Sequence, residues 1–206
     1  MSQTNLEWSG RSKNKSDGLG HNEETLMRST TESVENRIYF YSEVTSDSVL
    51  QFNRKLKEID NTNISDKCKK EMEFDIPIYI NINSLGGEIF SGLSAMDNIK
   101  QCKSPTTTIV DGCCASAATF ISIAGTKRFI TQHSVMLIHQ LSACYWGKYK
   151  EFKDEAKNLD LFMKIIKDMY LNKTKIPEKK LNEILERDLF FDSKTCLKYG
   201  MVDKVL

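Results

Sequence analysis

The sequence predicts an α/β domain in which helices pack on a sheet. Short apolar, β-branched segments such as Pro77–Asn83 and Thr106–Asp111 are typical of buried strands. Segments with apolar residues at helical spacing, such as Ser46–Asp60, lie between the strands. Alternation of the two kinds of segment favours helices that cover a sheet. The 206 residues suffice for one domain with a sizeable core.

The first half of the chain is expected to hold three strands and three helices. Apolar residues Val49, Phe52 and Leu56 are spaced as on one face of a helix, and Asn61–Asp75 is polar and irregular, which predicts a loop. The strands are expected at Arg37–Val44, Pro77–Asn83 and Thr106–Asp111, and the helices at Ser46–Asp60, Glu88–Gln101 and Ala115–Ala124.

The second half contains the longest helical pattern, Glu151–Lys173. Its apolar residues occupy two faces, which favours a buried partner surface such as another subunit. Pro177 is suited to open the next helix. The other elements are expected as strands Lys127–Thr131, Val135–His139, Asp188–Phe191 and Met201–Leu206, and helices Pro177–Arg187 and Ser193–Tyr199.

Composition and charge argue against several classes of function. The 29 basic and 28 acidic residues give a net charge of +1, so there is no electrostatic case for nucleic acid. No apolar run is long enough to span a membrane, and no membrane association is expected. The six cysteines form no CxxC pair and no histidines lie at zinc spacing, so no metal site is expected.

The same cysteine usage favours reducing surroundings, and we expect a cytoplasmic protein. An organelle stroma or matrix and the cytoplasm of a virus-infected host cell stay open as alternatives. Residues 1–36 are rich in serine, asparagine, glycine and charge, which predicts a disordered tail ahead of a domain at 37–206.

The segment Gly112–Phe120 contains the candidate nucleophile. It follows a β-branched strand and opens a helix of small residues, so Ser116 is expected at a strand-to-helix turn. A hydroxyl in that position is held on rigid backbone beside the first N–H groups of a helix, as nucleophilic attack requires. Taken alone, the segment also fits a serine chosen only for close helix packing.

Three further residues fit the other roles of acyl transfer. His139 ends an apolar strand and is a candidate base, with a structural histidine as the alternative. Asp188 follows a helix and could orient that base, or form an ordinary salt bridge. Gly87 ends a strand at a turn and is a candidate oxyanion donor or a plain turn residue. No third spaced glycine and no Walker lysine follow it, which argues against dinucleotide and P-loop sites.

Five motifs in a fixed order connect these residues to a known family. They are Tyr79–Gly87 with Gly92 after it, Gly112–Ser116, Val135–Gln140, Glu186–Asp188 and Tyr199–Asp203. In these motifs and their spacing, from about Arg37 to Leu206, the chain resembles the Clp protease proteolytic subunit (ClpP) family of ATP-dependent serine peptidases. Five motifs at near-family spacing form a specific match.

The resemblance implies a ClpP/crotonase-like spiral of ββα units with a protruding helical handle at about 151–173. It implies that Ser116 is the nucleophile, His139 the general base and Asp188 the orienting carboxylate. The implied oxyanion hole uses the backbone N–H groups of Gly87 and Ala117. A polypeptide substrate would lie extended beside Gly86 and Leu141, paired by main-chain hydrogen bonds.

The resemblance also implies partners. Family members form stacked heptameric rings and work with an AAA+ unfoldase. The chain itself would then need no cofactor, since only the partner ATPase would use ATP. Leu85 and Leu141 stand where the family usually has proline, and Ala117 and Ala118 replace Met-Gly, changes that affect turn rigidity and pocket shape but remove no reacting atom.

Two departures concern the groove that receives the ATPase. Asn81 and Gln101 occupy positions that are usually aromatic in the family. Burying either amide without a partner would cost about 1–3 kcal/mol. We therefore expect a non-standard motor or none.

Two rival functions stay open. A catalytically silent ring subunit would have a structural or regulatory role, but it would have no chemical reason to keep Ser116, His139 and Asp188 together. A crotonase-like acyl-CoA enzyme would use an oxyanion hole with a carboxylate base and would not need the serine and histidine pair.

Overall fold

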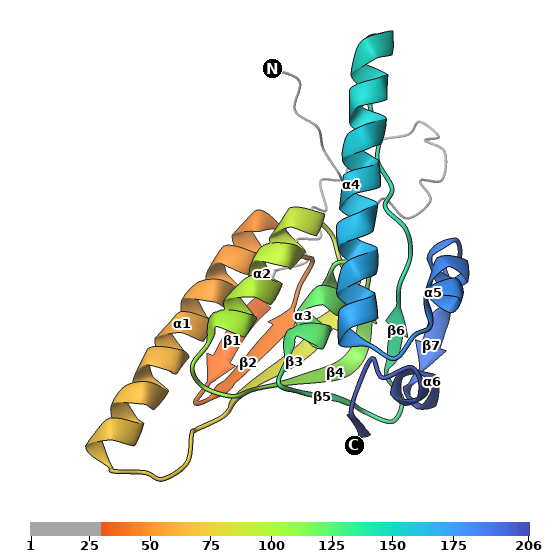
Figure 1. Ribbon diagram of the computed structural model, residues 1–206. Helices are drawn as coiled ribbons and strands as arrows, with labels where there is room; N and C mark the ends of the chain where they lie inside the picture. Colours follow the sequence, from red (N-terminus) through yellow and green to blue (C-terminus); the bar gives the residue numbers. More distant parts are fainter. Residues whose placement is uncertain (1–29) are drawn as a thin grey trace, which may run out of the picture.

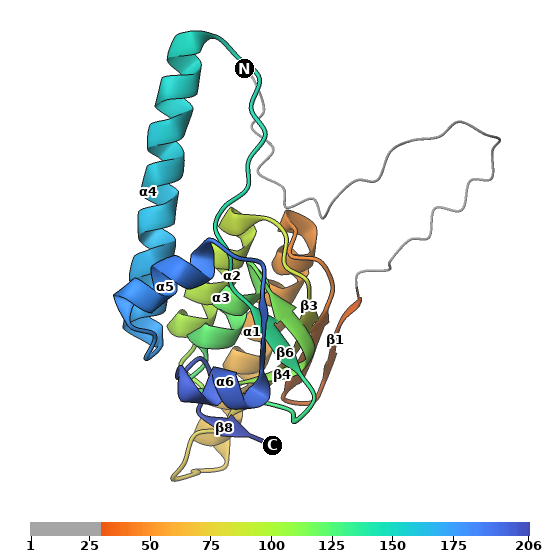
Figure 2. The same ribbon diagram turned by 90° about the vertical axis from the view of Figure 1, so that its right-hand side faces the viewer.

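The computed structural model describes residues 30–206, an α/β domain with one long helix standing away from it (Figures 1 and 2). The strands are β1 (Thr30–Val34), β2 (Arg37–Tyr41), β3 (Ile78–Ser84), β4 (Thr106–Ala115), β5 (Lys127–Ile130), β6 (Val135–Leu137), β7 (Phe190–Asp192) and β8 (Lys204–Val205). The helices are α1 (Ser46–Lys69), α2 (Ile89–Gln101), α3 (Ala118–Ala124), α4 (Tyr149–Lys173), α5 (Glu178–Leu185) and α6 (Ser193–Lys198).

The sheet is built around the long strand β4. Its main path runs β1-β2-β3-β4-β5-β8, with β1 antiparallel to β2 and every later pair parallel. The first half of β4 pairs with β5 through Thr107–Val110, and its last three residues pair with β6. Strand β6 in turn pairs with β7 in antiparallel fashion. The end of β4 therefore lies where two groups of strands meet.

Helices α1, α2 and α3 lie together on one side of the sheet (Figure 1). Apolar side chains of β2 and β3, such as Phe40 and Ile80, are fully buried beneath them. Phe40 meets Phe52 of α1 edge to face, with ring centroids 5.7 Å apart, a favoured geometry for aromatic pairs. This core holds β3 and β4 in register.

Strands β2, β6 and β8 are shorter than the sequence predicted, and three larger differences stand out. Residues 30–34 form β1, within the segment expected to be a disordered tail, and residues 1–29 lie outside the described part of the chain. Helix α1 runs to Lys69, although a loop was expected from Asn61. Its polar extension is anchored because buried Asn63 donates a hydrogen bond to the carbonyl of Ile76. Strand β4 continues to Ala115, so α3 begins at Ala118.

Helix α4 stands out from the domain (Figures 1 and 2). At 1.5 Å per residue, its 25 residues measure about 37 Å. Its buried residues, Ile166, Met169 and Tyr170, all lie near its C-terminal end, whereas Phe152, Leu161 and Ile165 are exposed. The helix is thus fixed to the domain at one end. Within residues 30–206, no helix is long and apolar enough to span a membrane.

Candidate active site

Ser116 lies at the turn between β4 and α3 with a backbone conformation that is rare for serine. Its φ is 54°, in the left-handed region, which costs an L-residue roughly 1–2 kcal/mol. Two main-chain hydrogen bonds help to hold it there. The Ser116 N–H donates to the carbonyl of Leu137 in β6 at 2.9 Å, and the N–H of Thr119 donates to the Ser116 carbonyl at 3.0 Å. Strained residues of this kind concentrate at functional sites.

The Gly86–Gly87 turn packs directly against this serine. A Cβ on Gly86 would lie 2.6 Å from the Cβ of Ser116, so only glycine fits. Both glycines have positive φ, 99° and 145°. The segment is fixed on its other side by Val44, whose N–H donates to the Gly86 carbonyl and whose carbonyl accepts from Glu88, both at 2.7 Å. The turn is therefore rigid without the proline that Leu85 replaces.

His139 follows β6 and is placed beside the end of β4 by the pairing of these strands. Its side chain is 7% exposed, and burial lowers its pKa below the ordinary 6.5. The nearby Asp188 carboxylate and a backbone hydrogen bond at Gln140 oppose this shift. The imidazole is thus favoured in its neutral form, which can accept a proton.

Asp188 is 3.7 Å from His139, measured from carboxylate Oδ1 to imidazole Nδ1. This distance allows an electrostatic contact but exceeds the usual length of a hydrogen bond. The Asp188 side chain is 75% exposed, so solvent screens part of its attraction. His139 and Asp188 are therefore close to each other, but farther apart than a hydrogen-bonded imidazole and carboxylate.

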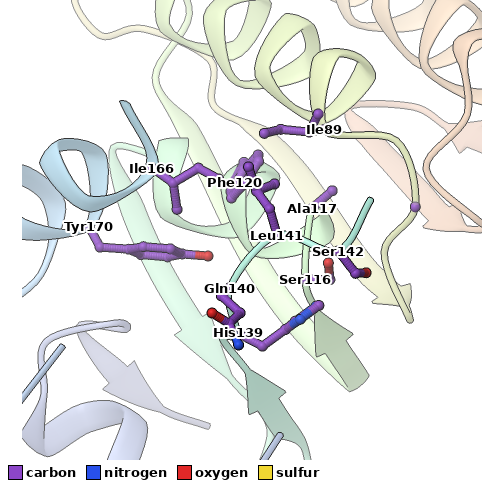
Figure 3. A pocket seen from close by; sticks show the side chains of 11 residues that line it. Ile89, Ser116, Ala117, Phe120, His139, Gln140, Leu141, Ser142, Ile166 and Tyr170 are labelled. Atoms are coloured by element: carbon purple, nitrogen blue, oxygen red, sulfur yellow. The ribbon is translucent and has the colours of Figure 1, made fainter. Parts of the chain in front are cut away.

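One pocket joins most of the residues singled out from the sequence (Figure 3). Ser116, Ala117, His139, Gly87 and Leu141 all line it. Gly86 and Asp188 are not part of the lining, but Gly86 packs against Ser116 and Asp188 lies 3.7 Å from His139. The pocket thus has a hydroxyl, an imidazole and two candidate N–H donors on its walls.

The sequence did not single out several other residues of the pocket. Its remaining wall consists of Ile89, Phe120, Gln140, Ser142, Ile166 and Tyr170. Tyr170 comes from the C-terminal end of α4, where the sequence pattern indicates only an apolar helix face. Ser142 lies just beyond the histidine motif and also faces the pocket (Figure 3). Among residues 30–206, no group of histidine, cysteine, aspartate or glutamate side chains is placed to hold a metal ion.

Comparisons with known proteins agree with this geometry. The Clp protease family model matches residues 31–206. The chain belongs to the Clp protease family. Its members are serine peptidases, so the reaction to explain is hydrolysis of a peptide bond by a serine nucleophile.

Three relatives with curated descriptions illustrate the match. An ATP-dependent Clp protease proteolytic subunit from Deinococcus radiodurans is 34% identical over 136 residues, covering 65% of this chain and 66% of that protein. One from Oltmannsiellopsis viridis is 32% identical, covering 62% and 67%. Subunit 1 from Protochlamydia amoebophila is 30% identical over 174 residues, covering 82% and 80%. The aligned part thus spans between 66% and 80% of these three relatives.

A solved structure confirms the expected fold. A ClpP1 mutant from Listeria monocytogenes superimposes with a TM-score of 0.70 at 23% sequence identity, covering 84% of this chain and 91% of that one. The α/β fold class and its ClpP-type architecture, predicted from the strand and helix pattern and the five motifs, are therefore correct.

Asn81 is buried and has two hydrogen-bond partners. Its Oδ1 accepts a hydrogen bond from Arg37 at 2.6 Å, and its Nδ2 donates to Asp111 at 3.2 Å. Tyr41 donates to the same Asp111 carboxylate oxygen at 2.6 Å. Strands β2 and β4 therefore supply hydrogen-bond partners for the Asn81 amide within the chain.

Gln101 ends α2 with its side chain exposed. It lines a small polar pocket between α1 and α2, together with Lys57, Asp60 and Cys102. The Gln101 amide is in contact with solvent, so the cost of burying it would arise only if a partner covered it. Both departures from the family thus lie in polar surroundings.

The close contact at Gly86 generates a testable prediction. In Gly86→Ala, the new methyl group would displace Ser116, and misplacement by about 1 Å can cost on the order of 100-fold in rate. Peptidase kcat/KM should fall by about that factor. Gly147→Ala is the control, because its new Cβ would meet only side-chain atoms of Glu151 and Tyr145. Equal activity of the two variants would contradict the prediction.

Proposed function

We propose that this chain is an active serine endopeptidase subunit in which Ser116 is the nucleophile, His139 the general base and Asp188 the residue that orients the base. One observation carries the proposal. Ser116, held at positive φ, shares a pocket with a buried His139, and Asp188 lies 3.7 Å from one nitrogen of that imidazole. This is the spatial order in which a serine peptidase moves its proton.

The reaction follows from these positions. Neutral His139 accepts the Ser116 hydroxyl proton while Oγ attacks the carbonyl carbon of the scissile peptide. The N–H groups of Gly87 and Ala117 stabilise the resulting oxyanion. The imidazolium then gives its proton to the leaving amine, and an acyl-enzyme remains. Water, deprotonated by the same histidine, hydrolyses the ester and restores Ser116.

The loose His139–Asp188 contact is compatible with this scheme. Catalytic hydrogen bonds are often long in the absence of substrate and shorten in the reacting complex. A carboxylate beside Nδ1 keeps the proton on that nitrogen, so that the other nitrogen can serve Ser116. Asp188 is exposed and 3.7 Å away, so we assign it an orienting role and not a proton-accepting one.

The substrate is a polypeptide bound in extended form between Gly86 and the segment that follows His139. Around Leu141 this segment lies in no regular helix or strand, and Gln140 N–H is fixed by the carbonyl of Leu185 at 2.8 Å. A main-chain edge of this kind can pair with a peptide strand. The apolar wall formed by Ile89, Phe120 and Ile166 is suited to an apolar side chain next to the scissile bond.

The subunit acts within stacked heptameric rings that enclose the active sites. Support comes from α4, which stands away from the domain and exposes Phe152, Leu161 and Ile165. Exposed apolar side chains on a protruding helix favour burial against another subunit. The chain has no cofactor of its own, and ATP is consumed only by a partner AAA+ ATPase. We place the protein in the cytoplasm.

The surface for that ATPase is altered at Asn81 and Gln101. Asn81 is tied into a network with Arg37 and Asp111, and Gln101 borders a pocket with Lys57 and buried Asp60. An apolar docking segment would have to dehydrate these polar groups without replacing their hydrogen bonds. We therefore propose that an ordinary Clp ATPase does not dock here.

Two rivals make different predictions. A catalytically silent ring subunit would assemble but leave Ser116 unreactive. A crotonase-like acyl-CoA enzyme would tolerate loss of the serine. The shared pocket of Ser116 and His139 favours the active peptidase over both.

Covalent labelling tests the nucleophile. The assembled wild-type protein should form a fluorophosphonate adduct on Ser116 and cleave peptides, and Ser116→Ala should do neither. Native mass spectrometry of the same samples should show rings of seven and fourteen chains. Assembled wild-type protein without an adduct would favour the silent subunit, and unchanged activity in Ser116→Ala would favour the crotonase-like enzyme.

The lowered pKa of His139 predicts the acid limit of activity. The base works only when neutral, so kcat/KM should decline as pH falls through a midpoint below 6.5. Asp188 raises this pKa, so Asp188→Asn should move the midpoint further down. Asp154→Asn, an exposed carboxylate on α4, should leave it unchanged. A midpoint above 6.5 in the wild type would contradict the assignment.

Docking can be tested with a bacterial Clp ATPase. It should neither co-purify with the wild-type protein nor stimulate degradation of a folded substrate. The double variant Asn81→Tyr with Gln101→Phe restores the family's aromatic residues and should gain binding. Lys103→Ala, a surface change near α2, serves as the matched control. Stable binding to the wild type would refute the proposal.

A further inference from the structure

Two buried hydroxyl groups connect helix α4 to the backbone of the candidate nucleophile. The Thr119 hydroxyl donates to the carbonyl of Ser116 at 2.6 Å. The Tyr170 hydroxyl lies 2.5 Å from the same Thr119 oxygen. Thr119 is fully buried and Tyr170 is 1% exposed. The contact therefore joins residues 51 positions apart in the sequence without solvent between them.

The direction of both hydrogen bonds follows from counting protons. A hydroxyl has one proton to donate, and Thr119 uses it on the Ser116 carbonyl, which can only accept. The bond between the two hydroxyls must then run from Tyr170 to Thr119. Burial raises the pKa of Tyr170 far above its ordinary value, so this phenol keeps its proton throughout the working pH range.

The carbonyl that receives these bonds shares a peptide group with the proposed oxyanion donor. The carbonyl of Ser116 and the N–H of Ala117 belong to one planar trans unit and point in opposite directions. Fixing the carbonyl on the side of Thr119 therefore fixes the direction of the Ala117 N–H. Hydrogen bonding to the carbonyl also polarises the peptide and strengthens its N–H as a donor.

A packing role alone explains this arrangement poorly. Apolar residues of the same shape would fill the space without burying two hydroxyls that must both be satisfied. The neighbours of the pair in the pocket, Phe120 and Ile166, are apolar. The Ser116 carbonyl already accepts from the Thr119 N–H at 3.0 Å, so the hydroxyl adds a second bond to it. That second bond defines its orientation more tightly.

We propose that Tyr170 and Thr119 are positioning residues for catalysis: their hydroxyls hold the peptide between Ser116 and Ala117 so that the Ala117 N–H is aimed at the developing oxyanion. This inference rests on the proposed function and extends it to a part of the site that lies outside the triad. Because the oxyanion exists only in the transition state and the intermediate, the pair affects kcat and the rate of acylation. It leaves the affinity for substrate unchanged.

A double-mutant cycle on the assembled full-length protein tests the proposal. The measurement is the second-order rate of fluorophosphonate labelling of Ser116, with kcat and KM for a peptide substrate. Removing an oxyanion donor costs 100- to 1,000-fold, so loosening one should cost less. Thr119→Val should slow labelling by about tenfold and Tyr170→Phe by about threefold, each through kcat with KM unchanged.

The cycle has a distinctive expected result. Since Tyr170 acts only through Thr119, adding Tyr170→Phe to Thr119→Val should cost nothing more. Thr119→Ser keeps the hydroxyl and should label at a rate close to the wild type. Independent, additive losses in the double variant would overturn the relay from Tyr170 through Thr119 to Ser116.

Matched controls separate positioning from stability. Thr62→Val removes an exposed hydroxyl that donates to a helix carbonyl, that of Glu58, and Tyr39→Phe removes a hydroxyl on β2, outside the pocket and outside α4. Both should label at the wild-type rate. If Thr119→Val fails to assemble, Tyr170→Phe and Thr119→Ser still decide the matter, because wild-type labelling by Tyr170→Phe would overturn the proposal.

The same experiment distinguishes this inference from the proposed function. If the wild-type protein forms no adduct on Ser116, both the proposed peptidase function and the positioning role are contradicted. Wild-type protein that is labelled, with variants labelled equally fast, would overturn the positioning role and leave the peptidase function standing.

Discussion

The contact between the Gly86–Gly87 turn and Ser116 is the constraint on which the site depends. The two backbone segments approach each other so closely that no Cβ would fit at position 86. The φ of 99° at this position also favours glycine. Each segment is pinned from its other side, one by Val44 and the other by Leu137. The sheet brings these anchors together, since β2, which precedes Val44, pairs with β3, and both β3 and β6 pair with β4. The backbone that carries the reactive hydroxyl is thus held by main-chain contacts on both sides, to which the Thr119 hydroxyl adds a side-chain contact.

Burial and charge act in opposite directions on the base. Removing His139 from solvent favours the neutral imidazole, and the Asp188 carboxylate favours the charged one. Burial is the larger influence because Asp188 is mostly exposed and 3.7 Å away. A base that is neutral at rest can take a proton at neutral pH without first losing one, and the nearby carboxylate becomes more useful once the imidazolium has formed.

The pattern of the sequence predicted the residues of the pocket better than the ends of the elements. Ser116 and His139 were identifiable because Ser116 follows a β-branched strand and His139 an apolar one, and these two strands are neighbours in the sheet. The end of α1 was not predicted because asparagine, present at position 63, is typical of loops. The side chain of Asn63 is held by a hydrogen bond to the carbonyl of Ile76, which the local pattern does not reveal. Thr119 and Tyr170 were missed for a similar reason. Each fits its local pattern, and only tertiary packing brings the two hydroxyls together.

Helix α4 is a rod fixed at one end, and Tyr170 belongs to that fixed end. A tilt of about 5° at the base would move the far end of a 37 Å helix by about 3 Å. Conversely, a contact that holds the N-terminal end of α4 would limit how far its C-terminal end can tilt. A contact made by another subunit at the far end of α4, about 32 Å from Tyr170, would therefore affect the geometry beside Ser116 through this helix.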